Sequence, residues 1–158
     1  MGSERQVKRL AEILVRHSVK AKKGEIVRIS TAELGRPLAL AVYREVLRAG
    51  AHPLLAAGFE EANGIFYEEA SPDQIRHMPP SKMFEAKTID ADIIILAPAN
   101  TRHLSHIPPR KIADRRKAIK PISEVLLRRV RWVLTNFPTE ALAQETDPIA
   151  VLKSDAGL

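Results

Sequence analysis

Residues 91–97, with the sequence ADIIILA, constrain the fold of this chain more than any other segment. A short run of β-branched and apolar residues predicts a strand that is buried on both faces, as at the centre of a parallel sheet. Such a strand needs neighbouring strands at its sides and helices above and below the sheet. The rest of the chain is therefore expected to alternate strands with helices.

Three more segments have the pattern of strands bounded by turn residues, namely residues 25–31, 52–57 and 131–135. Helical spacing of apolar residues predicts helices over residues 4–19, 37–50, 81–89, 110–129 with a bend at Pro121, and 140–145 with Thr139 as its cap. Together these elements predict an α/β fold, a three-layer structure with a mainly parallel four-stranded sheet and helices on both faces. The expected strand order is flavodoxin-like, with the strands in the order second, first, third, fourth.

Two serines mark helix starts. Ser3 and Ser71 are each followed three residues later by glutamine, which is the spacing of a capping box, and Pro72 suits the first turn of a helix. We therefore expect a helix to begin after each serine, the second one interrupted near residues 78–80.

Composition limits the class of protein. A chain of 158 residues, 45% of them hydrophobic, is the size of one domain with an ordinary core. It has no apolar run of about 18 residues and no apolar secretory signal, so we expect a cytoplasmic protein without a membrane partner. Without cysteine there is no disulfide, thiolate nucleophile or cysteine-bound zinc. The arginine-rich, cysteine-free composition also fits a thermophilic source.

The positive charge is concentrated in one region. Residues 101–131 hold ten basic and two acidic residues, a formal charge of +8, whereas the whole chain carries +6. A basic helix can follow a phosphate backbone, but aromatic side chains that would stack on bases are missing before Trp132. A solvated helix face explains the charge better than nucleic-acid binding. The candidate basic surface is Arg110, Lys111, Arg115, Arg116 and Lys117.

Side chains capable of chemistry are sparse. His103 and His106 have a spacing compatible with metal binding, but no carboxylate lies close to them in sequence. The paired glutamates at 60–61 and 68–69 are interpreted as a solvated loop face, because adjacent residues point apart. Asp90 and Asp92 precede their strand and so lie at the wrong end for a ligand site. No glycine-rich phosphate-binding motif is present.

In a parallel sheet, ligands meet the loops at the carboxyl ends of the strands. Four polar residues are expected at these loops as a possible rim or interface, although helix caps and loop hydrogen bonds explain them about as well. They are Asn100, Arg102, Asn136 and Thr139.

An ordered set of segments resembles one protein family. The set comprises residues 10–18 with Gly24-Glu25, residues 37–50 (PLALAVYREVLRAG), residues 90–100 (DADIIILAPAN) and residues 131–144 (RWVLTNFPTEALAQ). Between them, Glu69-Ala70-Ser71 and the turn at residues 107–110 fall in the expected order. These segments resemble the amino-terminal domain of the thermophilic aminopeptidase T and aminopeptidase S (leucyl aminopeptidase) metallopeptidase family.

The resemblance implies an amino-terminal α/β domain over residues 1–145, followed by a divergent carboxyl tail at residues 146–158. Complete members of such a family hold two divalent metal ions that polarise the scissile carbonyl and activate water, with ligands in a following domain. The resemblance therefore implies no catalytic, cofactor-binding or metal-binding residue in this sequence. It leaves open whether the chain takes part in an enzyme.

Three functional hypotheses follow. The first is a truncated, non-catalytic aminopeptidase-related domain that acts in association, as a homo-oligomer such as a dimer or with a separate metal-domain chain. The second is a subunit that completes a split metalloaminopeptidase, in which case peptides would be its substrates. The third is a basic nucleic-acid-binding module, which the missing aromatic residues disfavour.

Overall fold

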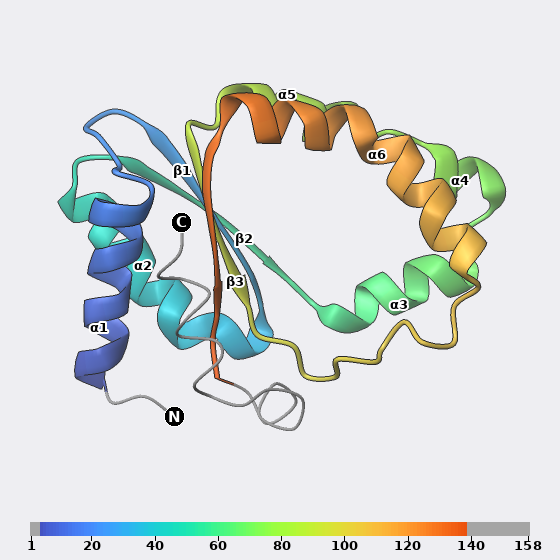
Figure 1. Ribbon diagram of the computed structural model, residues 1–158, viewed down its shortest axis with the longest axis horizontal. Coiled ribbons are helices and arrows are strands. Elements are labelled where there is room, and N and C mark those ends of the chain that lie inside the picture. The colour runs from blue at the N-terminus through green and yellow to red at the C-terminus, as the bar shows by residue number, and fades with distance from the viewer. Residues whose placement is uncertain (1–3, 139–158) are drawn as a thin grey trace.

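The computed structural model describes residues 4–138, which form a sheet of four parallel strands in the order β2-β1-β3-β4 (Figure 1). The strands are β1 (Ile26–Ala32), β2 (His52–Gly58), β3 (Ala91–Leu96) and β4 (Arg131–Asn136). The helices are α1 (Glu4–Glu12), the π-helix η1 (Ile13–Ser18), the 3-10 turn η2 (Glu33–Gly35), α2 (Arg36–Arg48), α3 (Glu60–Glu69), α4 (Pro72–Arg76), α5 (Pro80–Thr88) and α6 (Pro109–Arg129). The predicted α/β class and strand order are confirmed.

Some predictions fall outside the described residues. The cap at Ser3, the cap at Thr139, the helix at residues 140–145 and the tail at residues 146–158 are among them. The other predicted helices and strands are found within a few residues of their expected bounds.

One face of the sheet carries the main core. Alternate residues of β1 and β3, such as Ile29 and Ile93, pair in register and point toward α1, η1 and α2. There they pack against apolar side chains of these helices, including Val15 and Val42, which are fully buried. The amphipathic pattern of α2 thus serves to cover this face, because side chains three and four residues apart lie on one side of a helix.

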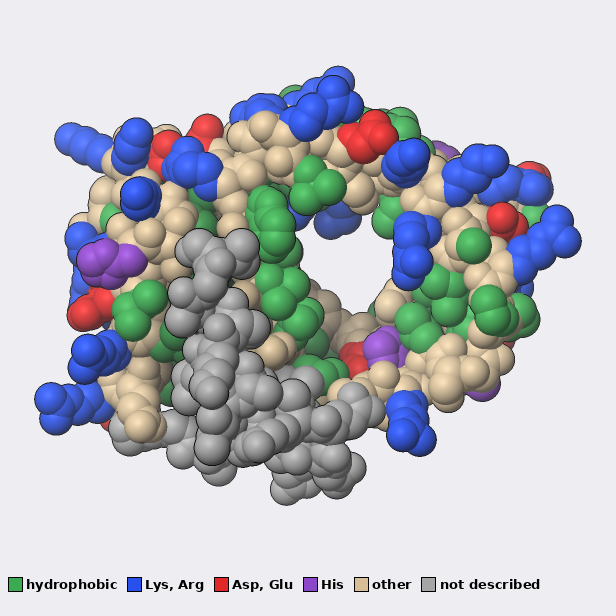
Figure 2. Space-filling model, viewed as in Figure 1, with side chains coloured by type: hydrophobic (Ala, Val, Ile, Leu, Met, Phe, Trp, Pro, Cys, Tyr) green, Lys and Arg blue, Asp and Glu red, His purple; other side chains and the backbone are tan. Residues whose placement is uncertain are grey.

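The other face of the sheet is open to a hollow. Here the prediction that residues 91–97 are buried on both sides is wrong at two positions, because Ile94 is only partly buried and Leu96 is 41% exposed. In the neighbouring strand β4, Trp132 is 48% and Leu134 is 40% exposed, and Ile94 pairs with Leu134 in register. Figure 2 shows these apolar strands along one wall of the hollow.

Helices α3 to α6 form an arch that faces the open side of the sheet (Figure 1). A second, smaller core holds the arch together, with Tyr67, Ile75 and Ile107 buried against each other. The interpretation of the paired glutamates at 60–61 and 68–69 as a loop face is wrong, because all four residues belong to α3, which runs from Glu60 to Glu69. The apolar residues of α3 have only a weak helical periodicity, so the sequence did not predict this helix. Contacts of α3 with α4 and with the loop before α6 stabilise it instead.

Two local predictions are confirmed within the arch. At Ser71, the side-chain oxygen accepts the backbone N–H of Gln74 at 3.2 Å and the Gln74 side chain accepts that of Ser71 at 2.9 Å, so the capping box is complete. Helix α6 continues through Pro121 as one element and curves along the arch (Figure 1). Proline removes one helical hydrogen bond and favours such curvature.

No helix among residues 4–138 combines the length and the apolar character that crossing a membrane requires.

Candidate functional site

A groove of about 480 Å³ lies at the carboxyl ends of β1 and β3. The chain leaves β1 toward β2 on one side and reaches β3 on the other, so the strand order reverses between β1 and β3. In open parallel sheets, ligands bind in the crevice at this point of reversal. The groove is lined by the ends of both strands, the first turns of α3 and the loop after β3, including Ser30, Ala56, Phe59, Asn63, Ile94 and Leu96.

Glu60 and His103 form a pair at the edge of the groove. The Nδ1 atom of His103 lies 2.9 Å from Glu60 Oε1 and 2.9 Å from the carbonyl oxygen of Asn100. Because both neighbours are acceptors, we assign the proton to Nδ1, which leaves Nε2 as the ring nitrogen able to meet a ligand. Glu60 also accepts the backbone N–H of Ala99 at 2.7 Å and begins α3, where the helix dipole favours a negative charge.

A second pair links the same two segments. The Nε2 atom of His106 lies 2.6 Å from Glu68 Oε1, and both side chains are exposed. The sequence had offered no carboxylate near the two histidines, but the fold brings one to each of them from about 40 residues away. The two predicted metal candidates therefore have separate carboxylate partners, which lie about 12 Å apart along α3.

The family resemblance implies two divalent metal ions, so the donor residues can be tested against that requirement. Among residues 4–138, no group of three or more histidine, aspartate or glutamate side chains is arranged to hold a metal ion. Each histidine–glutamate pair offers at most two donors, whereas a catalytic zinc site takes three protein ligands. The described region does not fit a two-metal centre.

The predicted rim residues lie at the expected end of the sheet where they are described. Asn100 follows β3, and its side-chain oxygen accepts the backbone N–H of Arg102 at 2.9 Å, which makes it a loop-stabilising residue. Asn136 ends β4 and pairs in register with Leu96. Thr139 lies outside the described residues. Asn100 thus contacts Glu60 and His103, two residues that line the groove and that the rim prediction did not include.

The opposite half of the open sheet face holds a buried ionic cluster. Arg28 donates to Asp92 and to Glu85, and Ser30 donates to Asp92 at 3.1 Å. Burial opposes the charge on Arg28, but the hydrogen bonds to Asp92 and Glu85 outweigh burial and raise the pKa of Arg28. Asp90 accepts the backbone N–H of Ile26 at 2.8 Å. Both aspartates therefore serve the sheet, in agreement with their predicted position at its amino end.

Two of the five residues of the predicted basic surface hold the arch together. Lys111 donates to the carbonyl oxygen of Tyr67 at 2.7 Å, and Arg115 donates to that of His77 at 2.5 Å while lying over the ring of Phe66. Further along the region, Lys120, Arg128, Arg129 and Arg131 also contact described residues. At least six of the ten basic side chains are thus engaged in contacts within the protein, so fewer of them are available to contact a phosphate backbone.

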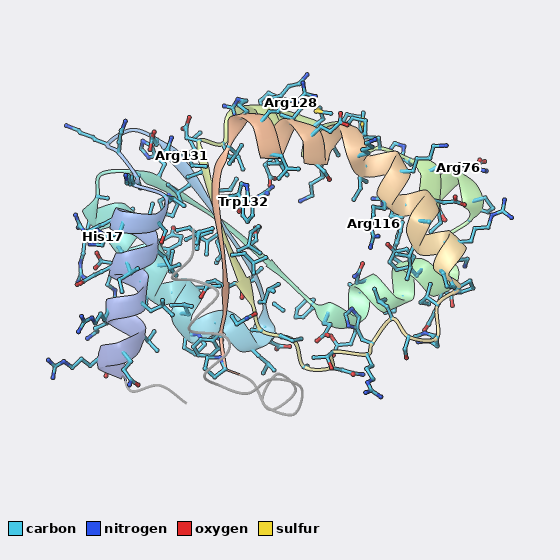
Figure 3. All side chains as sticks on the ribbon, in the orientation of Figure 1. His17, Arg76, Arg116, Arg128, Arg131 and Trp132 are labelled. Atoms are coloured by element: carbon cyan, nitrogen blue, oxygen red, sulfur yellow. The ribbon has the colours of Figure 1, made fainter. Side chains whose placement is uncertain are left out.

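Trp132 and Arg116 point into the hollow from opposite walls (Figure 3). Trp132 comes from β4. It lines a pocket of about 260 Å³ together with residues at the carboxyl end of α6 and just after it, namely Leu126, Leu127 and Val130. His17, Arg76 and Arg128 instead lie on the outside of the molecule. The hollow therefore has an apolar sheet wall and a helical wall with a cationic side chain.

Comparison with known proteins identifies a family. The family described as thermophilic metalloprotease (M29) matches residues 3–152. Among solved structures, the chain is similar to wild-type AmpT from Thermus thermophilus, with a TM-score of 0.72 and 17% sequence identity. That similarity covers 92% of this chain and 39% of AmpT, so the chain spans well under half the length of the solved relative. No curated protein matches. Because the family match extends over nearly all of its residues, the chain belongs to the M29 family of thermophilic metalloproteases.

Proposed function

We propose that this chain provides the amino-terminal α/β domain of an M29-type aminopeptidase and acts by association with a metal-bearing domain, without catalysing the reaction by itself. The open apolar face of the sheet carries this proposal. Trp132, Leu134 and Leu96 lie on it and are each at least 40% exposed, although their strands are flanked by a well-packed core on the other side.

An apolar sheet face of this kind is unusual on a protein that acts alone. Parallel sheets are normally covered on both faces, and contiguous exposed apolar residues mark interaction surfaces. The edge of β4 adds backbone N–H and C=O groups that, within the described residues, pair only with β3. We infer that another domain covers this wall and that it brings the metal ligands.

Similarity to AmpT supports the choice of partner. The chain corresponds to 39% of the AmpT chain, so the larger part of that relative has no counterpart in the matched region. The donors found among residues 4–138 do not make a two-metal site. A metal-bearing domain, in the same polypeptide or in a separate subunit, covers the exposed apolar side chains of the sheet. It also supplies the metal ligands that the reaction needs.

An activity assay tests the non-catalytic part of the proposal. The purified chain is incubated with zinc, cobalt or manganese and leucine p-nitroanilide, and no metal-dependent release of nitroaniline is expected. Turnover that stays with the chain through successive purification steps, at a constant specific activity, would contradict the proposal.

A pull-down measurement tests the association, and light scattering measures self-association of the chain. For the pull-down, the chain is coupled to a resin and mixed with the metal-bearing domain of an M29 protein from the same organism. Binding is expected, and Trp132→Ser with Leu134→Ser should abolish it. The matched control is Phe84→Ser on α5, because Phe84 is 72% exposed and does not line the hollow's pockets. Equal binding by both variants would show that the metal-bearing domain does not bind the apolar sheet face. A self-associated chain that leaves no binding to the metal-bearing domain would show the same.

A further inference from the structure

We propose that the groove at the carboxyl ends of β1 and β3 binds an uncharged apolar amide, such as a short apolar peptide segment. This inference goes beyond the proposed docking role, because it concerns a small-ligand site at the carboxyl ends of the strands, which shares Leu96 with the apolar face. It rests on the position of the groove, the chemistry of its walls and the orientation of His103.

The walls of the groove favour an apolar ligand. Ile94 and Leu96 from β3, Ala56 from β2 and Phe59 before α3 line it. Phe59 is 69% exposed, which leaves an aromatic ring available at the mouth of the groove. Ligand pockets combine a mainly apolar lining with a few polar groups that set orientation, and about 480 Å³ accommodates a molecule of the size of one or two residues.

Two polar groups can recognise an amide. Because the Nδ1–H of His103 is directed at Glu60 and at the carbonyl of Asn100, its Nε2 can accept an amide N–H. Asn63, on the exposed side of α3, also lines the groove and carries both a donor and an acceptor. Together they match the N–H and C=O groups of an amide.

The electrostatics disfavour a charged ligand. Glu60 is the one acidic residue that lines the groove among the described residues, and its two oxygens already accept the N–H groups of Ala99, Asn100 and His103. No lysine or arginine lines the groove in this part of the chain. An anion entering it would lose hydration without gaining a partner of opposite charge, and a cation would have to compete with these three N–H groups for Glu60, whereas a neutral amide loses less hydration.

A titration with N-acetyl-leucinamide tests the site directly. This probe has an isobutyl group and two amides but no charge. We expect saturable chemical-shift changes in the nitrogen-15-labelled full chain, confined to residues 30–32, 59–63, 94–98 and 103, with a dissociation constant on the order of 1 mM for so small a ligand. N-acetyl-glycinamide should bind more weakly. Shifts that do not saturate, or that map elsewhere, would overturn the proposal.

Variants separate the groove from a general effect on the fold. His103→Asn retains a side-chain N–H near the position of Nδ1 but removes Nε2, and Leu96→Ala shortens one wall; each should weaken binding about fivefold. His106→Gln is the matched control, because His106 pairs with Glu68 and does not line the groove. It should leave binding unchanged.

The controls also distinguish the ligand class. Equal shifts with inorganic phosphate would show that the groove is an anion site and contradict the assignment. If His103→Asn disturbs folding, seen as loss of spectral dispersion, Leu96→Ala still decides the question. Because the titration needs neither metal nor partner, failure of this proposal is distinguishable from failure of the proposed docking function.

Discussion

Arg28 of β1 and Asp92 of β3 are register partners in the sheet and form a two-point ion pair, with Nε–Oδ1 at 3.1 Å and Nη2–Oδ2 at 2.5 Å. Their side chains are 12% and 4% exposed, so the pair lies at the buried end of the otherwise apolar open face. Glu85 brings α5 into the same cluster at 2.7 Å. The pair thus joins the sheet centre to the arch.

Removing Asp92 should destabilise the protein strongly. Asp92→Ala leaves Arg28 charged and only half compensated by Glu85, and loss of one partner of a buried ion pair costs about 3 kcal/mol in the free energy of unfolding. Urea denaturation measures the change. Glu124→Ala is the control, because Glu124 is 46% exposed and its pairs with Lys120 and Arg128 are longer than 3.5 Å. Similar losses in both variants would contradict the special role of the Arg28 pair.

Neighbouring arginines on α6 should behave differently. Arg115 donates to the carbonyl oxygens of Ile75 and His77 and lies 4.9 Å from the centre of the Phe66 ring. Arg115→Ala leaves these groups without their partner and should increase amide hydrogen exchange in α3 and α4 about tenfold. Arg116→Ala, which changes the same charge on a side chain that points into the hollow, should leave exchange there unchanged. An equal rise in amide exchange in the two variants would show that charge, and not the carbonyl contacts, stabilises the arch.

Two glycines provide a matched test of packing. A Cβ atom at Gly35 would lie 2.1 Å from Thr31 Oγ1 and 3.1 Å from Ile95 Cγ2, so Gly35→Ala should destabilise the protein by about 1–3 kcal/mol. A Cβ atom at Gly64, inside α3, meets nothing within 4 Å. Gly64→Ala should therefore stabilise the protein by about 0.5–1 kcal/mol through its better helix propensity. Thermal unfolding measures both, and a stabilising Gly35→Ala would refute the close packing of η2 on the sheet.

Pro121 tests what curves α6. The residue interrupts the helical hydrogen bonding in the middle of a 21-residue helix that nevertheless continues past it. Pro121→Ala restores a backbone donor and should raise the melting temperature, because the contacts of α6 with α4 and α5 hold the curve without the proline. A lower melting temperature would indicate that the proline itself sets the curvature that these contacts require.

Local patterns were sufficient to predict the sheet. The strands around Ile29 and Ile93, the helix after Pro37 and the cap at Ser71 are each encoded within a few residues, by the alternation of apolar side chains or by cap chemistry. Right-handed crossovers between parallel strands then leave few possible orders, and the predicted one is observed.

The candidate site depended on contacts that no local pattern contains. Asn100 was expected at the carboxyl ends of the strands and lies there, but α3 was expected as a loop and His103 was considered as a metal ligand without a carboxylate. The pairing of Glu60 with His103 joins residues 43 positions apart, and that of Glu68 with His106 joins residues 38 apart.

The sequence by itself determined the strands and their order, because these follow from periodicity and from the handedness of the chain. Only the tertiary structure decided that the arch stands away from the sheet, exposes Trp132 and forms a groove beside His103. Such features depend on the sum of weak contacts among α3, α4 and α6, and this sum exists only after distant segments have come together.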